Sequence, residues 1–334
     1  MSRVVNFLVA LFCCAAISGA SGDELMDIIS AFAEGPLANL LDSYIDPPPR
    51  KTGFETLVPQ QNVRLYCTKT SEPLFQEVFF GDVDVTKKIN FTLPLTIAIH
   101  GWRDNSQLTL YNNLTTRYLK FVKNTNYCLL DWRAYAEFGY QITARRSAPL
   151  VAQQLFAFLQ AISLLYYPLE KVSLIGFSMG GQIAGLTGKF LPGRLGTIYA
   201  LDPAGPLFST PFDIGPTRRI DGTDAKYVQV IYTSRYTVGF GPIVGTQNFL
   251  SNKGYHPQPP CASQGGGLTD LANAMRCSHQ YAVKLFVDAL DPANEIFGQK
   301  CVKVLGQLVC WSSIYPKDRL GVWAKRISGN FYLN

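Results

Sequence analysis

Short apolar runs and amphipathic segments alternate along most of this chain. Runs of strand length occupy residues 63–66, 75–80, 93–99, 127–132, 172–177, 196–201 and 225–232. Apolar residues recur at helical spacing over residues 108–122, 149–166 and 278–290. The first two runs predict early antiparallel strands, whereas the later ones alternate with helices. This order predicts an α/β fold with a mostly parallel sheet covered by helices on both faces.

The first 22 residues differ from this pattern and resemble a secretory signal peptide. Arg3 supplies a positive charge, residues 4–17 are almost all apolar, and small residues at 18–22 provide cleavage sites. The apolar run is shorter than the roughly 20 residues that a membrane-spanning helix needs. We therefore expect residues 1–22 to be removed and the mature protein to be secreted into the extracellular space.

Residues 23–60 form a second distinct segment. Apolar residues recur there at roughly helical spacing up to Leu41, and a proline run at 47–49 then breaks the pattern. We expect an amphipathic N-terminal extension and a stiff linker that pack against the domain formed by residues 61–334. A propeptide or a helix that binds a lipid interface is the alternative.

Composition and charge exclude several classes of protein. Of the 334 residues, 47% are hydrophobic and 16% are charged, which is typical of a globular protein with a large core. The net charge of +6 is mild; it is compatible with an anionic lipid surface as a partner, and equally with an ordinary solvated surface. No run of basic residues indicates a nucleic-acid partner.

The cysteines and two sequons agree with a secreted protein. Cys13 and Cys14 leave with the signal peptide, so six of the eight cysteines remain. An even number in a secreted chain predicts three disulfides, with fifteen possible pairings. No C-x-x-C pair is present, which argues against a zinc or redox site. Asn90 and Asn113 each begin an N-x-T sequon and are predicted glycosylation sites.

The segment Gly176-Phe177-Ser178-Met179-Gly180 lies between a predicted strand and a predicted helix. A G-x-S-x-G sequence in this context is typical of a nucleophile elbow, in which a sharp turn exposes a serine hydroxyl above the sheet. The N-terminus of the following helix then directs backbone N–H groups towards developing negative charge. A tight strand–helix turn without chemistry is the alternative interpretation.

A serine nucleophile needs a base and an acid to orient it. Asp202 follows the strand after the elbow, and His279 follows Cys277-Ser278 in a predicted loop at the start of the last helix. The order serine, aspartate, histidine is that of hydrolases with a nucleophile elbow. We therefore predict Ser178, Asp202 and His279 as a catalytic triad, although each of the last two alone is more often structural.

An oxyanion hole requires two backbone donors. Met179, directly after the serine, supplies one N–H group, and Trp102, which follows an apolar strand and His100-Gly101, is the candidate for the other. We expect His100 to shape this loop and His256 to lie in a surface loop. None of these residues calls for a cofactor or a metal ion.

Together these residues resemble the animal lipase family, which includes pancreatic lipase, lipoprotein lipase, the sn-1 phospholipases and the wasp-venom phospholipases. The matching stretches are Ile99-His100-Gly101-Trp102, Leu130-Asp131-Trp132-Arg133, Gly176-Phe177-Ser178-Met179-Gly180-Gly181, Leu201-Asp202-Pro203-Ala204-Gly205-Pro206, Asp224-Ala225-Lys226-Tyr227-Val228 and Cys277-Ser278-His279. The resemblance covers residues 61–334. It implies an α/β-hydrolase fold, hydrolysis of lipid esters, and the triad and oxyanion donors named above.

The resemblance also bears on the disulfides. Cys261 and Cys277 match the pair that closes the lid segment in this family. Cys301 and Cys310 are expected to form a local bridge. Cys67 and Cys128 are then left by elimination, and would tie an N-terminal strand to the sheet.

Three features compared with this family favour a phospholipid substrate. The segment between Cys261 and Cys277 is short and contains three consecutive glycines, the loop at 233–245 is short, and the chain ends where the family's catalytic domain ends. We therefore expect a phospholipase A1 that acts at a membrane or lipid-droplet surface, and take a monomer as the default oligomeric state. A triacylglycerol lipase is the nearest alternative. An inactive lipid-binding or yolk-like storage protein is the alternative of another class, and the intact triad argues against it.

Overall fold

The computed structural model describes residues 52–69, 72–79, 81–105, 109–262, 268–304 and 307–333. The chain divides into two compact units, Met1–Pro48 and Pro49–Asn334, and all described residues belong to the second. The predicted signal peptide, and the predicted extension up to residue 51, lie outside the described residues.

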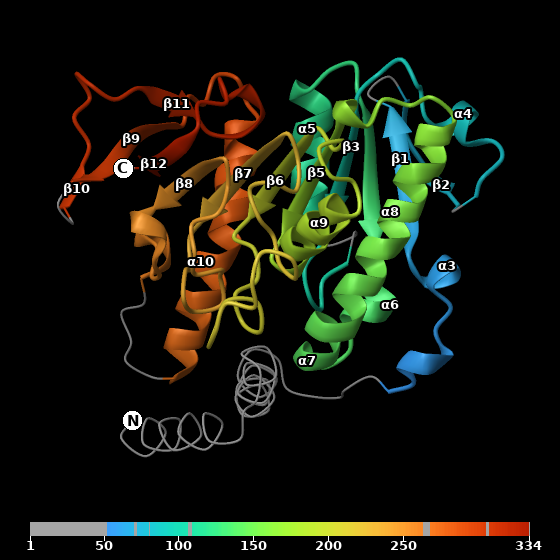
Figure 1. The fold of residues 1–334 in the computed structure, drawn as a ribbon, viewed down its shortest axis with the longest axis horizontal. Coiled ribbons are helices and arrows are strands. Elements are labelled where there is room, and N and C mark those ends of the chain that lie inside the picture. The colour runs from blue at the N-terminus through green and yellow to red at the C-terminus, as the bar shows by residue number, and fades with distance from the viewer. Residues whose placement is uncertain are drawn as a thin grey trace, which may run out of the picture. The chain divides into compact units, whose positions relative to one another are not determined.

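One 12-stranded sheet forms the centre of the unit (Figure 1). In spatial order its strands are β10 (Gln307–Val309), β9 (Phe297–Val304), β12 (Gly329–Leu333), β8 (Gln247–Ser251), β7 (Tyr227–Tyr232), β6 (Thr197–Leu201), β5 (Val172–Phe177), β3 (Leu95–Ile99), β4 (Asn126–Asp131), β1 (Arg64–Lys69) and β2 (Glu72–Val78), while β11 (Lys317–Arg319) pairs with β9. The strands from β12 to β4 are parallel, and those beyond them at both edges are antiparallel. The predicted α/β class is therefore confirmed.

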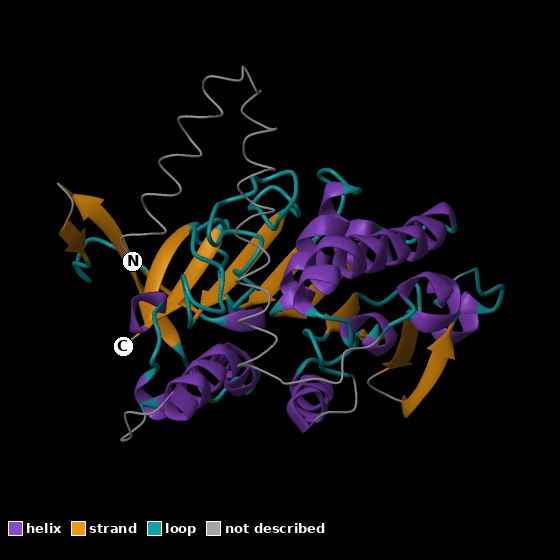
Figure 2. Ribbon diagram, turned by 90° about the horizontal axis from the view of Figure 1, so that it is seen from below, coloured by secondary structure: helices purple, strands orange, loops and turns teal. Residues whose placement is uncertain are grey.

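Helices cover both faces of the sheet (Figure 2). The helices are α3 (Pro59–Asn62), α4 (Val85–Lys88), α5 (Thr109–Phe121), α6 (Arg133–Ala136), α7 (Tyr140–Ile142), α8 (Ala148–Leu164), α9 (Met179–Lys189) and α10 (Leu268–Ala289). Short turns of helix are η1 (Phe54–Thr56), η2 (Thr143–Ser147), η3 (Leu169–Lys171), η4 (Asn252–Gly254), η5 (Pro259–Cys261) and η6 (Gly321–Trp323). Helix α8 packs on α9, and α10 packs on α5. With both faces covered, the central strands β3, β4, β6, β7 and β8 are buried along their whole length.

The helical run Tyr140–Leu164 is long and apolar enough to cross a membrane by length and composition. Its second part, α8, buries Val151, Leu155, Leu159 and Ile162 at helical spacing. Helix α8 packs against α9. We therefore interpret α8 as a core helix of the domain.

The described part of the predicted extension packs against α6 and η2. The Phe54 ring lies 5.4 Å from that of Tyr135, whose hydroxyl donates to the Leu57 carbonyl at 3.1 Å. The guanidinium of Arg146 lies 4.3 Å above the Phe54 ring and forms an ion pair with Glu55 at 2.9 Å. Residues 54–57 are thus held on the surface of the domain by packing as well as by charge.

Strands β8 to β12 were not predicted from the sequence. The reason is visible in β8, where the first two residues, Gln247 and Asn248, are polar but buried. Their amides are satisfied across the sheet: Gln247 Nε2 donates to Asp318 at 2.7 Å, and Asn248 Nδ2 donates to Asn330 at 2.9 Å. Because partners from distant parts of the chain offset the cost of burial, this strand lacks the apolar pattern that predicts one.

Candidate active site

Ser178 occupies a sharp turn between β5 and α9. Its backbone has φ 55° and ψ −121°, a conformation that is rare for a residue with a side chain. Three hydrogen bonds stabilise the turn: Ser178 N–H donates to Leu201 O at 3.1 Å, and Gly181 and Ala204 each donate to Ser178 O at 3.0 Å. The side chain remains partly exposed at the carboxyl end of the parallel strands.

The two glycines of the elbow are required by lack of space. A Cβ atom at Gly176 would lie 2.2 Å from the carbonyl oxygen of Gly180. A Cβ atom at Gly180 would lie 2.3 Å from the carbonyl oxygen of Ile99 on β3. The helix can therefore begin directly against the sheet only because both positions lack a side chain.

Asp202 and His279 are 77 residues apart in the sequence but in contact in the structure. His279 Nδ1 lies 2.7 Å from Asp202 Oδ2, and the two side chains are 15% and 0% exposed. Asp202 follows β6, so it lies at the same sheet edge as Ser178, which follows β5. A carboxylate at Nδ1 favours the tautomer in which Nε2 is free to accept a proton.

The His279 ring also lies beside the elbow. Its centroid is 4.7 Å from that of Phe177, the residue before Ser178. Within the described residues, no hydrogen bond joins the Ser178 hydroxyl to His279. In structures without substrate such contacts are often long and tighten only when substrate binds.

The position of His279 within its element corrects the expectation from sequence. Helix α10 begins at Leu268, so His279 lies inside the helix and not in a loop at its start. The physical reason is a stripe of small residues, since Ala274, Ser278 and Ala282 are buried at a spacing of four. This spacing is visible in the sequence, but the segment before Cys277 was interpreted as a lid and not as part of a helix.

The predicted lid segment is consequently largely helical. Of the residues between Cys261 and Cys277, those from Leu268 onward belong to α10, and 263–267 lie outside the described residues. The Cys261–Cys277 disulfide joins η5 to α10, two residues before His279. The other two disulfides join Cys67 to Cys128 across β1 and β4, and Cys301 to Cys310.

The loop after β3 carries the predicted oxyanion donor Trp102. Its indole Nε1 donates to Phe138 O at 2.8 Å, and its ring contacts Tyr140 edge-on at 5.0 Å. Within the described residues, the backbone N–H of Trp102 has no hydrogen-bond acceptor. Met179 is fully buried at the first position of α9, where backbone N–H groups have no partner within the helix.

His100 is a structural residue of this loop. Its Nδ1 lies 2.9 Å from Gly101 O, and its Nε2 accepts a hydrogen bond from Trp132 N at 3.1 Å. The ring stacks on Trp132 with centroids 5.0 Å apart and is almost fully buried. Because both nitrogens are occupied, His100 has no free atom for proton transfer. His256, predicted to be a surface residue, is half-buried, and burial lowers its pKa.

Three residues that support the site were missed in the sequence. Ser234 contacts Asp202, whereas Tyr111 and Asp104 support the loop after β3. Burial raises the pKa of Asp104, and its electrostatic interactions with the imidazoles of His100 and His279 oppose this shift. No short motif marks these residues, because Ser234 comes from the end of β7, Tyr111 from α5 and Asp104 from the loop after β3.

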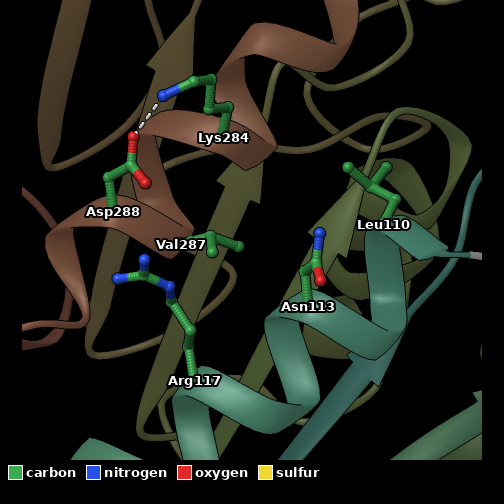
Figure 3. Close-up of a pocket in the computed structure, with 6 residues that line it drawn as sticks. All are labelled: Leu110, Asn113, Arg117, Lys284, Val287 and Asp288. Atoms are coloured by element: carbon green, nitrogen blue, oxygen red, sulfur yellow. Dashed lines mark hydrogen bonds and ion pairs between the residues drawn. The ribbon is translucent and has the colours of Figure 1, made fainter.

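A pocket of about 410 Å³ lies between α5 and α10, away from these residues (Figure 3). It is lined by Leu110, Asn113, Arg117, Lys284, Val287 and Asp288. Lys284 and Asp288 form an ion pair at 2.5 Å along α10, and Asn113 faces them from α5. Asn113 is exposed, but the threonine of its sequon, Thr115, is buried.

The sequon at Asn90 has a different local structure. Asn90 Oδ1 accepts hydrogen bonds from the backbone N–H of Thr92 at 3.0 Å and from its hydroxyl at 2.8 Å. This Asx turn holds the asparagine side chain on a partly exposed segment before β3.

Comparison with known proteins agrees with this geometry. The family model described as Lipase matches residues 51–319. This chain belongs to the lipase family. The resemblance inferred from the motifs is thereby confirmed, and the parallel sheet with a sharp strand–helix turn at Ser178 has the architecture of an α/β hydrolase.

Three relatives in the lipase family illustrate the range of similarity. Lipase member H from Oryctolagus cuniculus is 30% identical over 72% of this chain and 51% of its own length. Hepatic triacylglycerol lipase from the same species is 32% identical over 64% and 45%. Phospholipase A1 member A from Pongo abelii is 28% identical over 69% and 49%. The chain thus spans about half the length of the curated relatives it matches.

Proposed function

We propose that this lipase-family chain hydrolyses carboxylic esters of lipids through Ser178, Asp202 and His279. The observation that carries the proposal is the 2.7 Å contact between His279 Nδ1 and Asp202 Oδ2, one strand away from the strained Ser178 turn. A buried carboxylate that orients an imidazole next to a serine elbow serves general-base activation of the hydroxyl.

In the proposed reaction, Ser178 Oγ attacks the ester carbonyl while His279 Nε2 takes the hydroxyl proton. The backbone N–H groups of Trp102 and Met179 bind the oxyanion of the tetrahedral intermediate. His279 then gives the proton to the leaving alcohol, which leaves an acyl-enzyme. Water activated by His279 attacks the acyl carbon, and the fatty acid departs as Ser178 regains its proton.

For the substrate we propose the sn-1 acyl ester of phospholipids. The described residues between Cys261 and Cys277 are mostly helix α10 itself, so little chain is left to form a large cover over the site. A small cover leaves room for a phospholipid head group at the rim. Similarity to a protein named phospholipase A1 member A supports the same choice.

Triacylglycerol hydrolysis is the second candidate. It is favoured by one observation, the 32% identity to hepatic triacylglycerol lipase. The two substrates differ at the sn-3 position, where a charged head group replaces an apolar acyl chain. The rim of the site, rather than the triad, would therefore decide between them.

We also propose a secreted monomer that binds lipid aggregates at its surface. Three disulfides within the described residues support an oxidising compartment. Disulfides are uncommon in cytosolic proteins, where thiols are kept reduced.

The deciding experiment compares fatty-acid release from phosphatidylcholine and triolein by the full chain. Ser178→Ala should reduce release by at least about a thousandfold. Ser312→Ala, which alters an exposed serine, is the matched control and should leave release unchanged. Preferential sn-1 release from phosphatidylcholine supports the phospholipase, preferential triolein cleavage supports the second candidate, and release that does not depend on Ser178 refutes the mechanism.

A further inference from the structure

The carboxylate of Asp202 is surrounded by hydrogen-bond donors. Its Oδ1 accepts from the backbone N–H groups of Thr233 at 2.9 Å and Ser234 at 3.1 Å. Its Oδ2, the atom that contacts His279, also accepts a hydrogen bond from the Ser234 hydroxyl. Asp202 and Ser234 are both completely buried. The carboxylate is therefore fixed by four donors and shielded from water.

The Ser234 hydroxyl lies at the centre of the Asp202–His279 contact. Its Oγ is 3.4 Å from His279 Nδ1 as well as within hydrogen-bond distance of Asp202 Oδ2. Within the described residues these are its only hydrogen-bond partners. The hydroxyl thus has no separate structural bond to explain its presence in a fully buried position.

The surrounding backbone keeps this hydroxyl in place. Ser234 follows the end of β7, and the chain turns back so that Gly239 N–H donates to Ser234 O at 3.0 Å. A Cβ atom at Gly239 would lie 2.7 Å from both carboxylate oxygens of Asp202 and from Ser234 Oγ. The turn therefore closes directly over the pair.

We propose that Ser234 is a positioning residue of the triad, whose hydroxyl shares Asp202 Oδ2 with His279 and sets the basicity of the imidazole. The inference rests on the function proposed above. The hydroxyl acts only through Asp202 and His279 and does not touch the reacting atoms.

The direction of the effect follows from electrostatics. A hydroxyl that donates to Oδ2 offsets part of the negative charge that would stabilise protonated His279. Its removal strengthens the attraction between Asp202 and the imidazolium, so the pKa of His279 rises. Only the neutral imidazole can accept the serine proton. The acidic limb of the pH profile of kcat/KM should therefore move to higher pH.

Removing the Ser234 hydroxyl leaves the charged residues near His279 unchanged. Asp104, in the loop after β3, interacts electrostatically with His279, and Asp202 faces it from the end of β6. On α10 the nearest charged residues in sequence are Arg276 and Lys284. Within the described residues, Asp104, Arg276 and Lys284 do not contact the Ser234 hydroxyl, whose charged partner is Asp202.

The test compares Ser234→Ala with Ser234→Thr and Ser209→Ala. Threonine retains the hydroxyl. Ser209 is another buried serine of the same region, but in the described part of the chain its hydroxyl bonds only to the backbone of Gly205 and Gly241, at 3.4 and 3.0 Å. The pH dependence of kcat/KM is measured on a soluble p-nitrophenyl ester, which removes the lipid interface from the comparison.

Ser234→Ala should lower kcat by about tenfold or more, as expected for loss of a hydrogen bond to a charged group. Its acidic limb should move to higher pH, while Ser234→Thr keeps the wild-type limb. Ser209→Ala should leave the limb unchanged whatever its effect on stability. A folded Ser234→Ala protein with reduced kcat but an unmoved limb would show that Ser234 only fills space, and would overturn the proposal.

A second measurement separates this inference from the proposed function. The His279 imidazole is titrated by NMR in the Ser178→Ala protein, with and without Ser234→Ala, so that no turnover is needed. A higher pKa of His279 without the hydroxyl supports the positioning role even if the ester assay fails. An unchanged or lower value contradicts it, whereas failure of the wild-type chain to hydrolyse any ester contradicts only the proposed function.

Discussion

The hydroxyl of Tyr111 accepts a hydrogen bond from the backbone N–H of Gly101 across 3.0 Å. The same hydroxyl donates to Asp104 Oδ2 at 3.1 Å, and the Tyr111 side chain is almost fully buried. A side chain of α5 thereby fixes the residue before Trp102, the candidate oxyanion donor. The shape of this loop thus depends on a helix that carries none of the predicted catalytic residues.

Tyr111→Phe should weaken both stability and catalysis. The change removes the hydroxyl that accepts from Gly101 N–H and donates to Asp104, at a cost of about 1–3 kcal/mol in the free energy of unfolding. kcat should fall as well, because the loop bearing Trp102 loses its anchor. Urea unfolding and ester hydrolysis measure the two effects.

Tyr118→Phe is the matched control for this change. Tyr118 is also a buried tyrosine of α5, but its hydroxyl is paired with Thr96 at 2.7 Å. Its replacement should lower stability to a similar extent and leave kcat unchanged. An equal loss of kcat in both variants would mean that α5 acts only through global stability.

Asp224 should make stability depend on pH. Burial raises the pKa of this carboxyl group from 3.8 to about 6, even though Lys189 lies 2.5 Å away and opposes the shift. The folded state therefore binds more protons than the unfolded state between about pH 4 and pH 6, so stability falls as pH rises through this range. The resulting change in the free energy of unfolding over this range is at most about 3 kcal/mol.

Asp224→Asn should remove this dependence. The variant's free energy of unfolding, measured in urea at pH 4, 5 and 6, should be flatter than that of the wild-type protein. Asp213→Asn is a useful comparison, since its ion pair with Arg219 lowers the pKa of Asp213. The raised pKa of Asp224 would be refuted if the wild-type free energy of unfolding instead increased from pH 4 to pH 6 and Asp224→Asn abolished that increase.

Gly180→Ala should disrupt the elbow. The added methyl group would meet Ile99 O at 2.3 Å, so α9 must move away from β3 or the turn at Ser178 must change. We expect a loss of more than about 3 kcal/mol in stability, or an inactive protein if folding survives. Gly181→Ala, whose nearest neighbour is Pro203 Cβ at 3.0 Å, should cost less. Equal tolerance at both positions in thermal unfolding and activity assays would contradict the packing argument.

Loss of the Cys261–Cys277 disulfide should lower kcat even where the protein remains folded, so the loss of stability alone does not account for the effect. The bridge closes a loop with a sequence separation of 16, for which chain entropy predicts a loss of about 3 kcal/mol. It also holds α10 two residues from His279. The double alanine variant should therefore show reduced kcat under conditions in which it remains folded.

The Cys301–Cys310 pair provides the control for this experiment. It closes a loop with a separation of 9 at the strand β9, and none of the predicted catalytic residues lies on that strand. Its removal should lower the unfolding temperature with little change in kcat. A similar fall in kcat for both double variants would argue against a specific role for the Cys261–Cys277 bridge.

Glycosylation tests the proposed route to the cell exterior. Chain expressed in a eukaryotic secretory host should appear in the medium and lose mass on treatment with peptide N-glycosidase F. Asn90→Gln and Asn113→Gln should each remove one glycan. Retention of the unmodified chain inside the cell would contradict both the signal peptide and the glycosylation predictions.

Much of the fold follows from local patterns in the sequence. The apolar runs that became β3, β4, β5, β6 and β7 are buried on both faces, so their hydrophobicity is continuous and easily recognised. The elbow is recognisable for a related reason. Its turn needs glycine at fixed distances from Ser178, because neighbouring backbone atoms leave no space for a side chain.

The last third of the sheet and the full length of α10 could not be predicted in this way. Buried polar residues such as Gln247 are stabilised by partners about 70 residues away, and no local pattern records those partners. Helix α10 continues through Cys277 and His279 because small residues face the core, a weaker signal than a row of large apolar ones.

The sequence by itself determined the alternation of strands and helices, the glycines of the elbow, and the chain order of Ser178, Asp202 and His279. The alternation depends on interactions between residues close together in the chain, whereas the glycines and the chain order can be recognised directly as a motif. Only the tertiary structure decided what surrounds the predicted triad, since Ser234 comes from the end of β7 and Tyr111 from α5. The parallel sheet brings such residues to one edge because its strands all end there, and only that convergence gives Asp202 and Gly101 their buried hydrogen-bond partners.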